Sequence, residues 1–230
     1  MTALGTPRLH LRVTTSTNDR ARELAEAGAP HGTLVTAAEQ TAGRGRQGRR
    51  WSTPAGGTLA MSLILREPPA LPPLAAAVAV ADAAGPAARI KWPNDVLVDG
   101  RKVAGILIEG RPPAGWLVLG IGVNVAVDLT QLPPELAGTA GSLGRDPRDV
   151  ESFLADLLAA LEARLTQPAA EVLEAWRARD ALLDRPVTYA PPADGAGIAR
   201  GVDDDGRLIV ETPTGERVAL AAGEVHLSPS

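Results

Sequence analysis

Residues 43–51, GRGRQGRRW, combine three glycines with four arginines and end in a tryptophan. Guanidinium groups bind carboxylates and phosphates through paired hydrogen bonds, and glycines let a backbone close onto such an anion. Trp51 offers a flat face on which an aromatic base can stack. Because neighbouring cations repel one another, we expect an anion to join them. The segment therefore indicates a nucleotide site.

The same segment matches the spacing GxGxxG of dinucleotide-binding turns. That fingerprint requires a helix that begins inside the motif, so that pyrophosphate lies at its N-terminus. Here RRWSTPAGG follows, which is poor helix sequence, and we interpret residues 43–57 as a loop. We expect this loop to be mobile without ligand and ordered around one. The alternative is a solvated basic loop with Trp51 packed into the core.

A second group of polar residues lies at Lys91-Trp92-Pro93-Asn94-Asp95, around a proline turn at a strand end. Lys91 could neutralise a phosphate and Asn94 could donate to an oxygen. Asp95 could hold Mg²⁺, which prefers oxygen ligands and brings phosphate partners. The alternative is an ordinary corner in which Asn94 and Asp95 satisfy backbone groups.

A third candidate is Lys102, which leads into the apolar strand sequence VAGILIE. Its ammonium could face a carboxylate and stabilise the charge that develops as this becomes an acyl phosphate. Gly105 weakens the strand unless something approaches the backbone closely, and this predicts either a bound ligand or a bulge.

The segments between these motifs have the hydrophobic spacing of regular structure. Ser16 and Asp19 form a capping-box pattern that predicts a helix start, and Asp99-Gly100 predicts a hairpin turn. Strands are predicted at residues 9–13, 33–38, 58–65, 88–92, 103–109 and 116–125, and helices at residues 16–27, 72–84, 150–165 and 169–183. The pattern indicates a mixed α/β domain with considerable antiparallel pairing.

The sequence changes character near residues 184–186, and we predict a domain boundary there. Residues 1–184 would form the main domain. Residues 185–230 contain short β-like runs at 187–190, 197–202, 208–211 and 217–220, joined by Gly and Asp turns. This pattern predicts a small β-barrel.

Composition excludes several classes of function. The net charge of -4 argues against nucleic-acid binding, which needs a basic face. The chain has no cysteine, so disulfides and thiolate metal sites are excluded. No apolar stretch approaches the ~20 residues of a membrane span, and residues 1–5 lack the features of a signal peptide. We therefore expect a cytoplasmic protein that interacts with neither nucleic acid nor membrane.

Five motifs together resemble, in order and spacing, those of biotin-protein ligases. They are Ser16-Thr17-Asn18, GRGRQGRRW at 43–51, KWPND at 91–95, KVAGIL at 102–107 and GIGVN at 120–124. The resemblance covers residues 8–125 strongly and residues 186–227 more weakly. It implies an α+β fold of the class II synthetase-like, biotin-lipoate ligase kind, with a mixed, largely antiparallel sheet and a C-terminal SH3-like β-barrel.

The resemblance also implies a two-step reaction. Biotin attacks the α-phosphorus of ATP to give biotinyl-5′-AMP, and a lysine of a biotin carboxyl-carrier protein domain then attacks the mixed anhydride. ATP and Mg²⁺ would be the cofactors, and Asp95 would be a ligand of Mg²⁺. Catalysis would involve Lys102, Arg46, Arg49 and Lys91; biotin would contact Ser16, Thr17, Asn18, Gln40, Gly43, Arg44, Arg46, Lys102 and Gly105; ATP would contact Arg46, Arg49, Trp51, Lys91, Asn94, Lys102 and Asn124.

The sequence departs from the family pattern at Ala60, where family members often have an aromatic residue on the strand that lines the biotin pocket. Fifteen residues precede Ser16, too few for the helix-turn-helix domain of repressor-type members, so we expect the short form without DNA binding. A biotin-responsive repressor is thus one alternative. A lipoate ligase or transferase of the same superfamily is another, although a fatty-acyl ligand would need a long apolar tunnel. The resemblance further implies a homodimer formed through a sheet edge.

Overall fold

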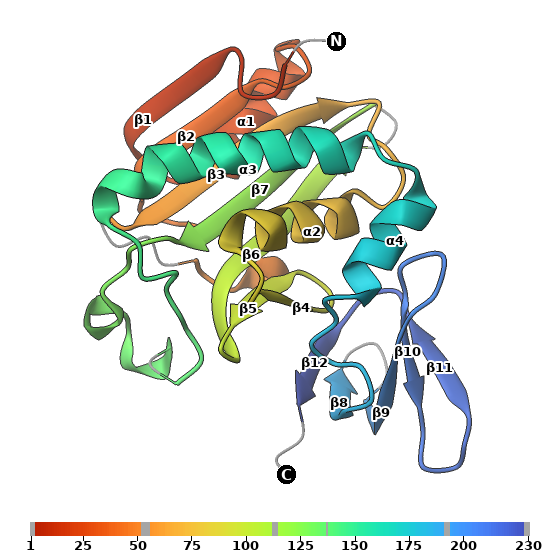
Figure 1. Cartoon of the computed structure of the whole chain (residues 1–230). Coiled ribbons are helices and arrows are strands. Elements are labelled where there is room, and N and C mark those ends of the chain that lie inside the picture. Colours follow the sequence, from red (N-terminus) through yellow and green to blue (C-terminus); the bar gives the residue numbers. More distant parts are fainter. Residues whose placement is uncertain (1–2, 52–55, 112–114, 137, 191–193, 228–230) are drawn as a thin grey trace.

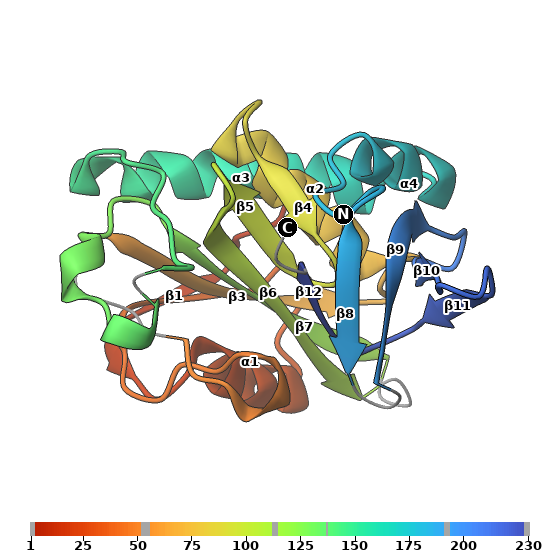
Figure 2. The ribbon, with the colours of Figure 1, turned by 90° about the horizontal axis from the view of Figure 1, so that it is seen from below.

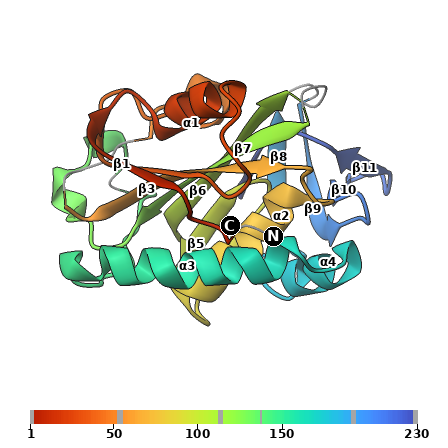
Figure 3. The same ribbon diagram turned by 90° about the horizontal axis from the view of Figure 1, so that it is seen from above.

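The computed structural model describes residues 3–51, 56–111, 115–136, 138–190 and 194–227 of the chain. These residues form a seven-stranded sheet with helices on both faces and a five-stranded sheet beside one end of it (Figure 1). Helix α1 covers one face of the large sheet, and helices α2 and α3 cover the other, as the views from below and above show (Figure 2, Figure 3).

The large sheet has the strand order β1-β2-β3-β7-β6-β5-β4. Its strands are β1 (Arg8–Thr14), β2 (Leu34–Gln40), β3 (Thr58–Arg66), β4 (Arg89–Lys91), β5 (Asp95–Val98), β6 (Arg101–Arg111) and β7 (Trp116–Asn124). The helices are α1 (Thr17–Glu26), α2 (Pro72–Ala84), α3 (Val150–Leu165) and α4 (Ala169–Arg177). Short 3₁₀ turns lie at Arg46–Gly48, Leu129–Gln131, Pro134–Leu136 and Pro147–Asp149.

The strand pairing confirms the predicted mixed, largely antiparallel sheet. Strands β1 and β2 are parallel because α1 connects them, and the remaining described neighbours in this sheet are antiparallel. The predicted hairpin turn joins β5 to β6, with φ of 51° at Asp99 and 74° at Gly100. Both values lie in the left-handed region that a tight two-residue hairpin turn requires.

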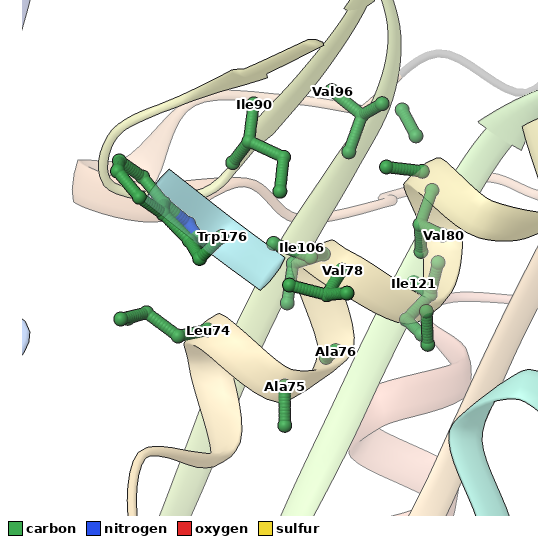
Figure 4. Close-up of a cluster of buried hydrophobic side chains, with 14 of the residues drawn as sticks. Leu74, Ala75, Ala76, Val78, Val80, Ile90, Val96, Ile106, Ile121 and Trp176 are labelled. Carbon is green, nitrogen blue, oxygen red and sulfur yellow. The ribbon is translucent and has the colours of Figure 1, made fainter. Parts of the chain in front are cut away.

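Helix α2 forms the centre of the core. Its residues 75–81 are each at most 1% exposed, because the helix is covered by the sheet on one side and by α3 and α4 on the other. Alanine and valine suit this position, since their small side chains let three layers pack closely. The close-up shows α2 with Val78 and Val80 beside Ile106 and Ile121 of the sheet and Trp176 of α4 (Figure 4).

Two local predictions were wrong at helix ends. The helix predicted at residues 169–183 ends at Arg177, because the following chain pairs with β4: Ile90 N–H donates to Arg179 O at 2.7 Å, and Ala181 N–H donates to Ile90 O at 2.8 Å. Ser16 precedes α1 as predicted, but its side chain makes no capping hydrogen bond. The capping box is absent because Asp19 instead forms ion pairs with arginine side chains.

The later strands form a separate antiparallel sheet with the order β11-β10-β9-β8-β12. They are β8 (Pro186–Ala190), β9 (Gly195–Val202), β10 (Leu208–Glu211), β11 (Arg217–Leu220) and β12 (Glu224–Leu227). Strand β12 was not predicted. This five-stranded sheet corresponds to the predicted SH3-like unit, and no pairing between β11 and β12 closes it among the described residues.

The two sheets share one apolar core, although a domain boundary at residues 184–186 stays a prediction. Tyr189 and Val210 of the small sheet belong to the same buried cluster as α2. The Trp92 indole N–H donates to Gly206 O at 3.1 Å, and the Arg177 guanidinium donates to Val202 O at 2.9 Å. None of the described helices is long and apolar enough to cross a membrane.

Asp180 lies at the junction of the two sheets, and the pKa of its carboxyl is shifted. Burial raises the pKa of its carboxyl to about 6, although the N–H groups of Leu182 and Leu183 oppose this rise. The N–H of Leu182 donates to Oδ1 at 2.8 Å, while Oδ2 is buried and has no hydrogen-bond partner among the described atoms. Because the folded pKa exceeds the unfolded value, Asp180 favours folding at low pH, and this contribution is lost as the pH rises through about 6.

We therefore predict that Asp180→Asn stabilises the protein at pH 8 by about 1 to 3 kcal/mol, because the uncharged amide needs no ionisation in the buried site. Urea unfolding at pH 4, 5, 6, 7 and 8 measures the free energy of unfolding. Between pH 4 and pH 8 the wild type should lose part of this free energy that Asp180→Asn retains. Asp156→Asn, on the exposed side of α3, serves as the control. Parallel pH profiles for wild type and Asp180→Asn would contradict the prediction.

Candidate active site

A cavity of about 460 Å³ brings the predicted motifs together. Its walls come from the start of α1, the loop at residues 43–51, the turn between β4 and β5, strands β6 and β7, the segment at residues 132–140 and β12. The predicted residues that line it are Ser16, Thr17, Asn18, Gln40, Arg44, Arg46, Arg49, Trp51, Lys91, Asn94, Asp95, Lys102, Gly105 and Asn124. Gly43 is the one predicted residue outside the described lining.

Gly43 shapes the loop instead. A Cβ atom at this position would lie 2.4 Å from Trp51 O, and Gly43 O accepts a hydrogen bond from Trp51 N–H at 2.8 Å. A neighbouring contact pairs Arg44 with Arg50 as an antiparallel bridge. The two ends of the arginine segment thus run side by side, and the absence of a side chain at Gly43 allows this approach.

The indole of Trp51 lies against two glycines that face each other across β6 and β7. Gly105 and Gly122 are register partners, and a Cβ atom on them would lie 3.1 Å and 2.4 Å from the Trp51 ring. Our sequence interpretation placed a ligand or a bulge at Gly105. The close approach is made by Trp51 and the end of Lys102, so the protein itself accounts for this glycine.

Lys102 places its ammonium group over this aromatic floor. Its Nζ lies 5.7 Å from the centre of the Trp51 ring and 2.6 Å from Asp95 Oδ1. The side chains of Lys102 and Asp95 are 32% and 18% exposed, so the pair is partly shielded from water. A substrate carboxylate entering here meets an ammonium group that already has one anionic partner.

Asp95 fits only part of a magnesium site. The described residues contain no group of three or more His, Cys, Asp or Glu side chains that could hold a metal ion. A single carboxylate is nevertheless what Mg²⁺ commonly takes from a protein when nucleotide phosphates and water supply the other oxygen ligands. The donor set is therefore compatible with a metal that arrives with a nucleotide.

The loop arginines have different partners. Arg44 Nη2 lies 2.7 Å from Asp19 Oδ1 and 2.9 Å from Glu109 Oε2, and Arg49 Nη2 lies 3.0 Å from Glu224 Oε1 in β12. Arg50 donates to Thr41 O at 2.9 Å. Protein acceptors therefore relieve much of the repulsion that we had assigned to a bound anion.

Among the described residues, two loop arginines form no ion pair: Arg50, which has the Thr41 carbonyl as its partner, and Arg46. Burial lowers the pKa of its guanidinium, and the charge of Arg49 lowers it further, whereas Asp95 and Glu224 oppose the effect. Lys91 is similar, because burial lowers the pKa of its ammonium, Asp95 raises it, and Lys102 and Arg49 lower it. An anion bound among these groups would relieve both the burial cost and the mutual repulsion.

The start of α1 forms a network of buried polar groups. Gln40 Oε1 accepts from the Thr17 N–H at 2.8 Å and from the Thr17 hydroxyl at 3.1 Å. The Ser62 hydroxyl, on β3, lies 2.8 Å from Thr17 Oγ1 and 2.6 Å from Asn18 Oδ1. Sequence reasoning missed Ser62, because a lone serine in an apolar strand gives no signal of its own.

Two predicted amides bind the backbone as well as lining the cavity. Asn94 Nδ2 donates to Ile106 O at 3.0 Å, and Ile106 N–H donates to Asn94 O at 2.9 Å, so the Asn94 side chain secures the corner as the alternative interpretation expected. Asn124 Nδ2 donates to Gly141 O at 2.9 Å. This bond fixes the segment after β7, where Leu132, Leu136 and Ala140 contribute an apolar wall that the sequence analysis missed.

Ala60, where the sequence departs from the family pattern, is buried opposite Gly122 in the register of β3 and β7. Residues opposite each other in an antiparallel pair share a face, so Ala60 lies on the Trp51 side of the sheet. It is absent from the described lining of the cavity.

Comparison with known proteins agrees with this geometry. The profile of the Biotin/lipoate A/B protein ligase family matches residues 10–128, and that of the Biotin protein ligase C terminal domain matches residues 192–228. The Biotin--[acetyl-CoA-carboxylase] ligase of Paracoccus denitrificans is 41% identical over 91% of this chain and 96% of its own length. The Bifunctional ligase/repressor BirA of Bacillus subtilis is 37% identical over 91% of this chain and 71% of its own length.

The fold also matches that of a solved biotin protein ligase. The structure of the biotin protein ligase from Aquifex aeolicus in complex with biotin and ATP superposes with a TM-score of 0.85 and 27% identity, covering 97% of this chain and 100% of that chain. A relative matched over 96% of its own length, both domain profiles and a matching fold lead to one conclusion. The chain belongs to the biotin protein ligase family.

Proposed function

We propose that the protein activates biotin with ATP and transfers it to a carboxylase carrier domain. The biotin carboxylate attacks the α-phosphorus of ATP, which gives biotinyl-5′-AMP and releases pyrophosphate. A carrier lysine then attacks the acyl carbon, forms an amide and releases AMP. The observation that carries this proposal is the meeting of Lys102, Trp51 and Arg46 in one cavity.

Charge neutralisation is the main contribution of the protein to the first step. Two anions, a carboxylate and a triphosphate, must approach each other, and their repulsion opposes the reaction. Lys102 would hold the carboxylate, while Arg46, Arg49 and Lys91 would face the phosphates. Once bound substrates hold these cations in place, they would stabilise the charge on the transferring group without further reorganisation.

The Lys102–Asp95 pair gives the site an internal counter-ion. When the carboxylate of biotin binds Lys102, the ammonium group is shared between two carboxylates. Its attraction to Asp95 then weakens, and Asp95 becomes a better ligand for a cation. Mg²⁺ bound there together with the phosphates would neutralise charge on the leaving pyrophosphate.

The adenine would stack on the face of Trp51 that turns away from Gly122, since the other face lies against the sheet. Asn124 Nδ2 already donates to Gly141 O, so an adenine amino group would donate its hydrogen bond to Asn124 Oδ1. On the other side of the cavity, Ser16, Thr17, Asn18, Gln40 and the backbone of Arg44 would bind the ureido ring of biotin.

We also make proposals about the cellular location and the partners of the protein. We propose a cytoplasmic location, no nucleic-acid partner, and a homodimer through an edge of the large sheet. In the described part β1 and β4 end the strand order, and β4 is already paired at Ile90 with residues 179–181. Ordering of the loop at residues 43–51 around the adenylate also stays a prediction.

We predict that the purified protein with biotin, ATP and Mg²⁺ releases pyrophosphate and labels a biotin carrier domain. Mass spectrometry of the reaction before carrier is added should detect biotinyl-AMP. Competition with lipoate separates the nearest alternative, because a biotin ligase should be inhibited little by lipoate. Folded protein that binds lipoate in preference to biotin would refute the proposal.

We predict that Lys102→Ala lowers the rate of biotinyl-AMP formation by at least about 100-fold, the usual loss when one such charge is removed. Arg101→Ala is the matched control, since Arg101 is exposed on the same strand and does not line the cavity. Single-turnover formation of biotinyl-AMP measures both. Equal rates for Lys102→Ala and Arg101→Ala would remove Lys102 from the reaction.

We predict that Gly122→Ala raises the KM for ATP about ten-fold or more, because the new methyl group displaces the Trp51 ring, whose nearest atom lies 2.4 Å from that Cβ position. Gly138→Ala is the control: Gly138 also lines the cavity, and a Cβ there meets nothing within 4 Å. Steady-state kinetics of pyrophosphate release compare them, and an unchanged KM in Gly122→Ala would show that the ring position is unimportant.

A further inference from the structure

Glu109 joins three separate parts of the chain at the edge of the active site. Its Oε2 atom accepts a hydrogen bond from Asn18 Nδ2 at 2.8 Å and one from Arg44 Nη2 at 2.9 Å. Glu109 belongs to β6, Asn18 to α1 and Arg44 to the loop at residues 43–51. One carboxylate oxygen therefore connects the sheet, the helix and the loop. Glu109 is not among the site residues that we predicted from the sequence.

Through Asn18, the carboxylate reaches the proposed ureido end of the cavity. Asn18 is 4% exposed, and its Oδ1 lies 2.6 Å from the Ser62 hydroxyl, which also lies 2.8 Å from Thr17 Oγ1. Thr17 in turn binds Gln40. The Asn18 amide is oriented by this arrangement, because Nδ2 must donate to Glu109 so that Oδ1 can accept from Ser62.

The packing leaves Asn18 little freedom to find another partner. A Cβ atom on Gly120 would meet Asn18 Oδ1, so the amide lies directly on the backbone of β7. Asn18 Nδ2 has a second contact with Leu107 O at 3.5 Å, which is at the limit of a hydrogen bond. Removal of the Glu109 carboxylate would therefore leave the buried Nδ2 group of Asn18 with only this weak partner.

Through Arg44, the same carboxylate fixes the start of the loop. Arg44 is held by both Glu109 and Asp19, so its guanidinium is neutralised by protein groups and is not free to bind a phosphate. Its side chain is 36% exposed, while its Nε atom is buried without a hydrogen-bond partner. Arg44 therefore acts as an anchor for the loop and differs in this from Arg46.

We propose that Glu109 is a positioning residue for the biotin half of the site, which orients the Asn18–Ser62–Thr17–Gln40 network and the backbone at Arg44. This inference rests on the proposed function. Glu109 touches neither the proposed phosphate positions nor the Trp51 floor, so its loss acts on biotin more than on ATP. The described lining of the cavity does not include Glu109, and it acts through its neighbours.

The test compares Glu109→Ala and Glu109→Gln with wild type. We expect Glu109→Ala to raise the Kd for biotin, measured by calorimetry with biotin alone, at least about ten-fold, the effect of losing one hydrogen bond to a charged group. The KM for ATP at saturating biotin should change less than about three-fold. Glu109→Gln keeps the shape and one acceptor oxygen, and should recover part of the loss, leaving biotin affinity about three-fold weaker than in wild type.

Asp19→Asn is the matched control. The Asp19 carboxylate pairs with Arg44, whereas the side-chain amide of Asn18 is bound by Glu109. Asp19→Asn should therefore alter biotin affinity less than about three-fold. A loss as large as that of Glu109→Ala would overturn the role given to the Asn18 contact. Unchanged biotin affinity in Glu109→Ala, or equal losses for biotin and ATP, would overturn the inference as a whole. If Glu109→Ala does not fold, an unchanged Kd in Glu109→Gln would overturn it.

Wild-type protein separates the two proposals. Wild type that binds biotin and forms biotinyl-AMP, together with a variant that does so equally well, would refute the role of Glu109 and leave the enzyme activity intact. Folded wild type that neither binds biotin nor forms the adenylate would refute the proposed function itself.

Discussion

The contact between the Trp51 indole and the two facing glycines of β6 and β7 holds the active site together. A loop with four arginines has little apolar surface of its own, and the indole supplies its anchor on the sheet. Because Gly105 and Gly122 are opposite each other, the strands form a flat place where a large ring fits. The same contact puts the loop within reach of Lys102.

The carboxylates around the cavity neutralise its cations to different degrees. Asp19 and Glu109 neutralise Arg44, which then serves as a structural anchor, whereas Arg46 and Lys91 stay partly buried and have no close ion pair among the described residues. Arg49 and Lys102 lie between these extremes, each with one acidic partner that an incoming anion can compete with. In the proposed function, substrate binding would be an exchange of ionic partners, which would limit the energetic cost of gathering so many charges.

The order of elements and most of the cavity lining follow from sequence alone, because amphipathic spacing and the five motifs are local signals. The predicted bounds of the helices at Pro72–Ala84 and Val150–Leu165 are those of α2 and α3. What the sequence could not predict depends on distant contacts. The early end of α4 requires pairing with β4, and the roles of Ser62, Glu109 and β12 require that far segments meet. The capping pattern at Ser16 failed for the same reason, since the partner of Asp19 lies in the loop.

Strand β12 has a consequence for how the protein is made. It contributes His226 and Leu227 to the cavity and Glu224 to Arg49, yet it is synthesised after the other walls of that cavity. Contacts between residues so far apart in the chain are slow to form. The seven strands of the large sheet are therefore all synthesised before Arg49 has its acidic partner, and the lining of the cavity is complete only when translation has passed β12.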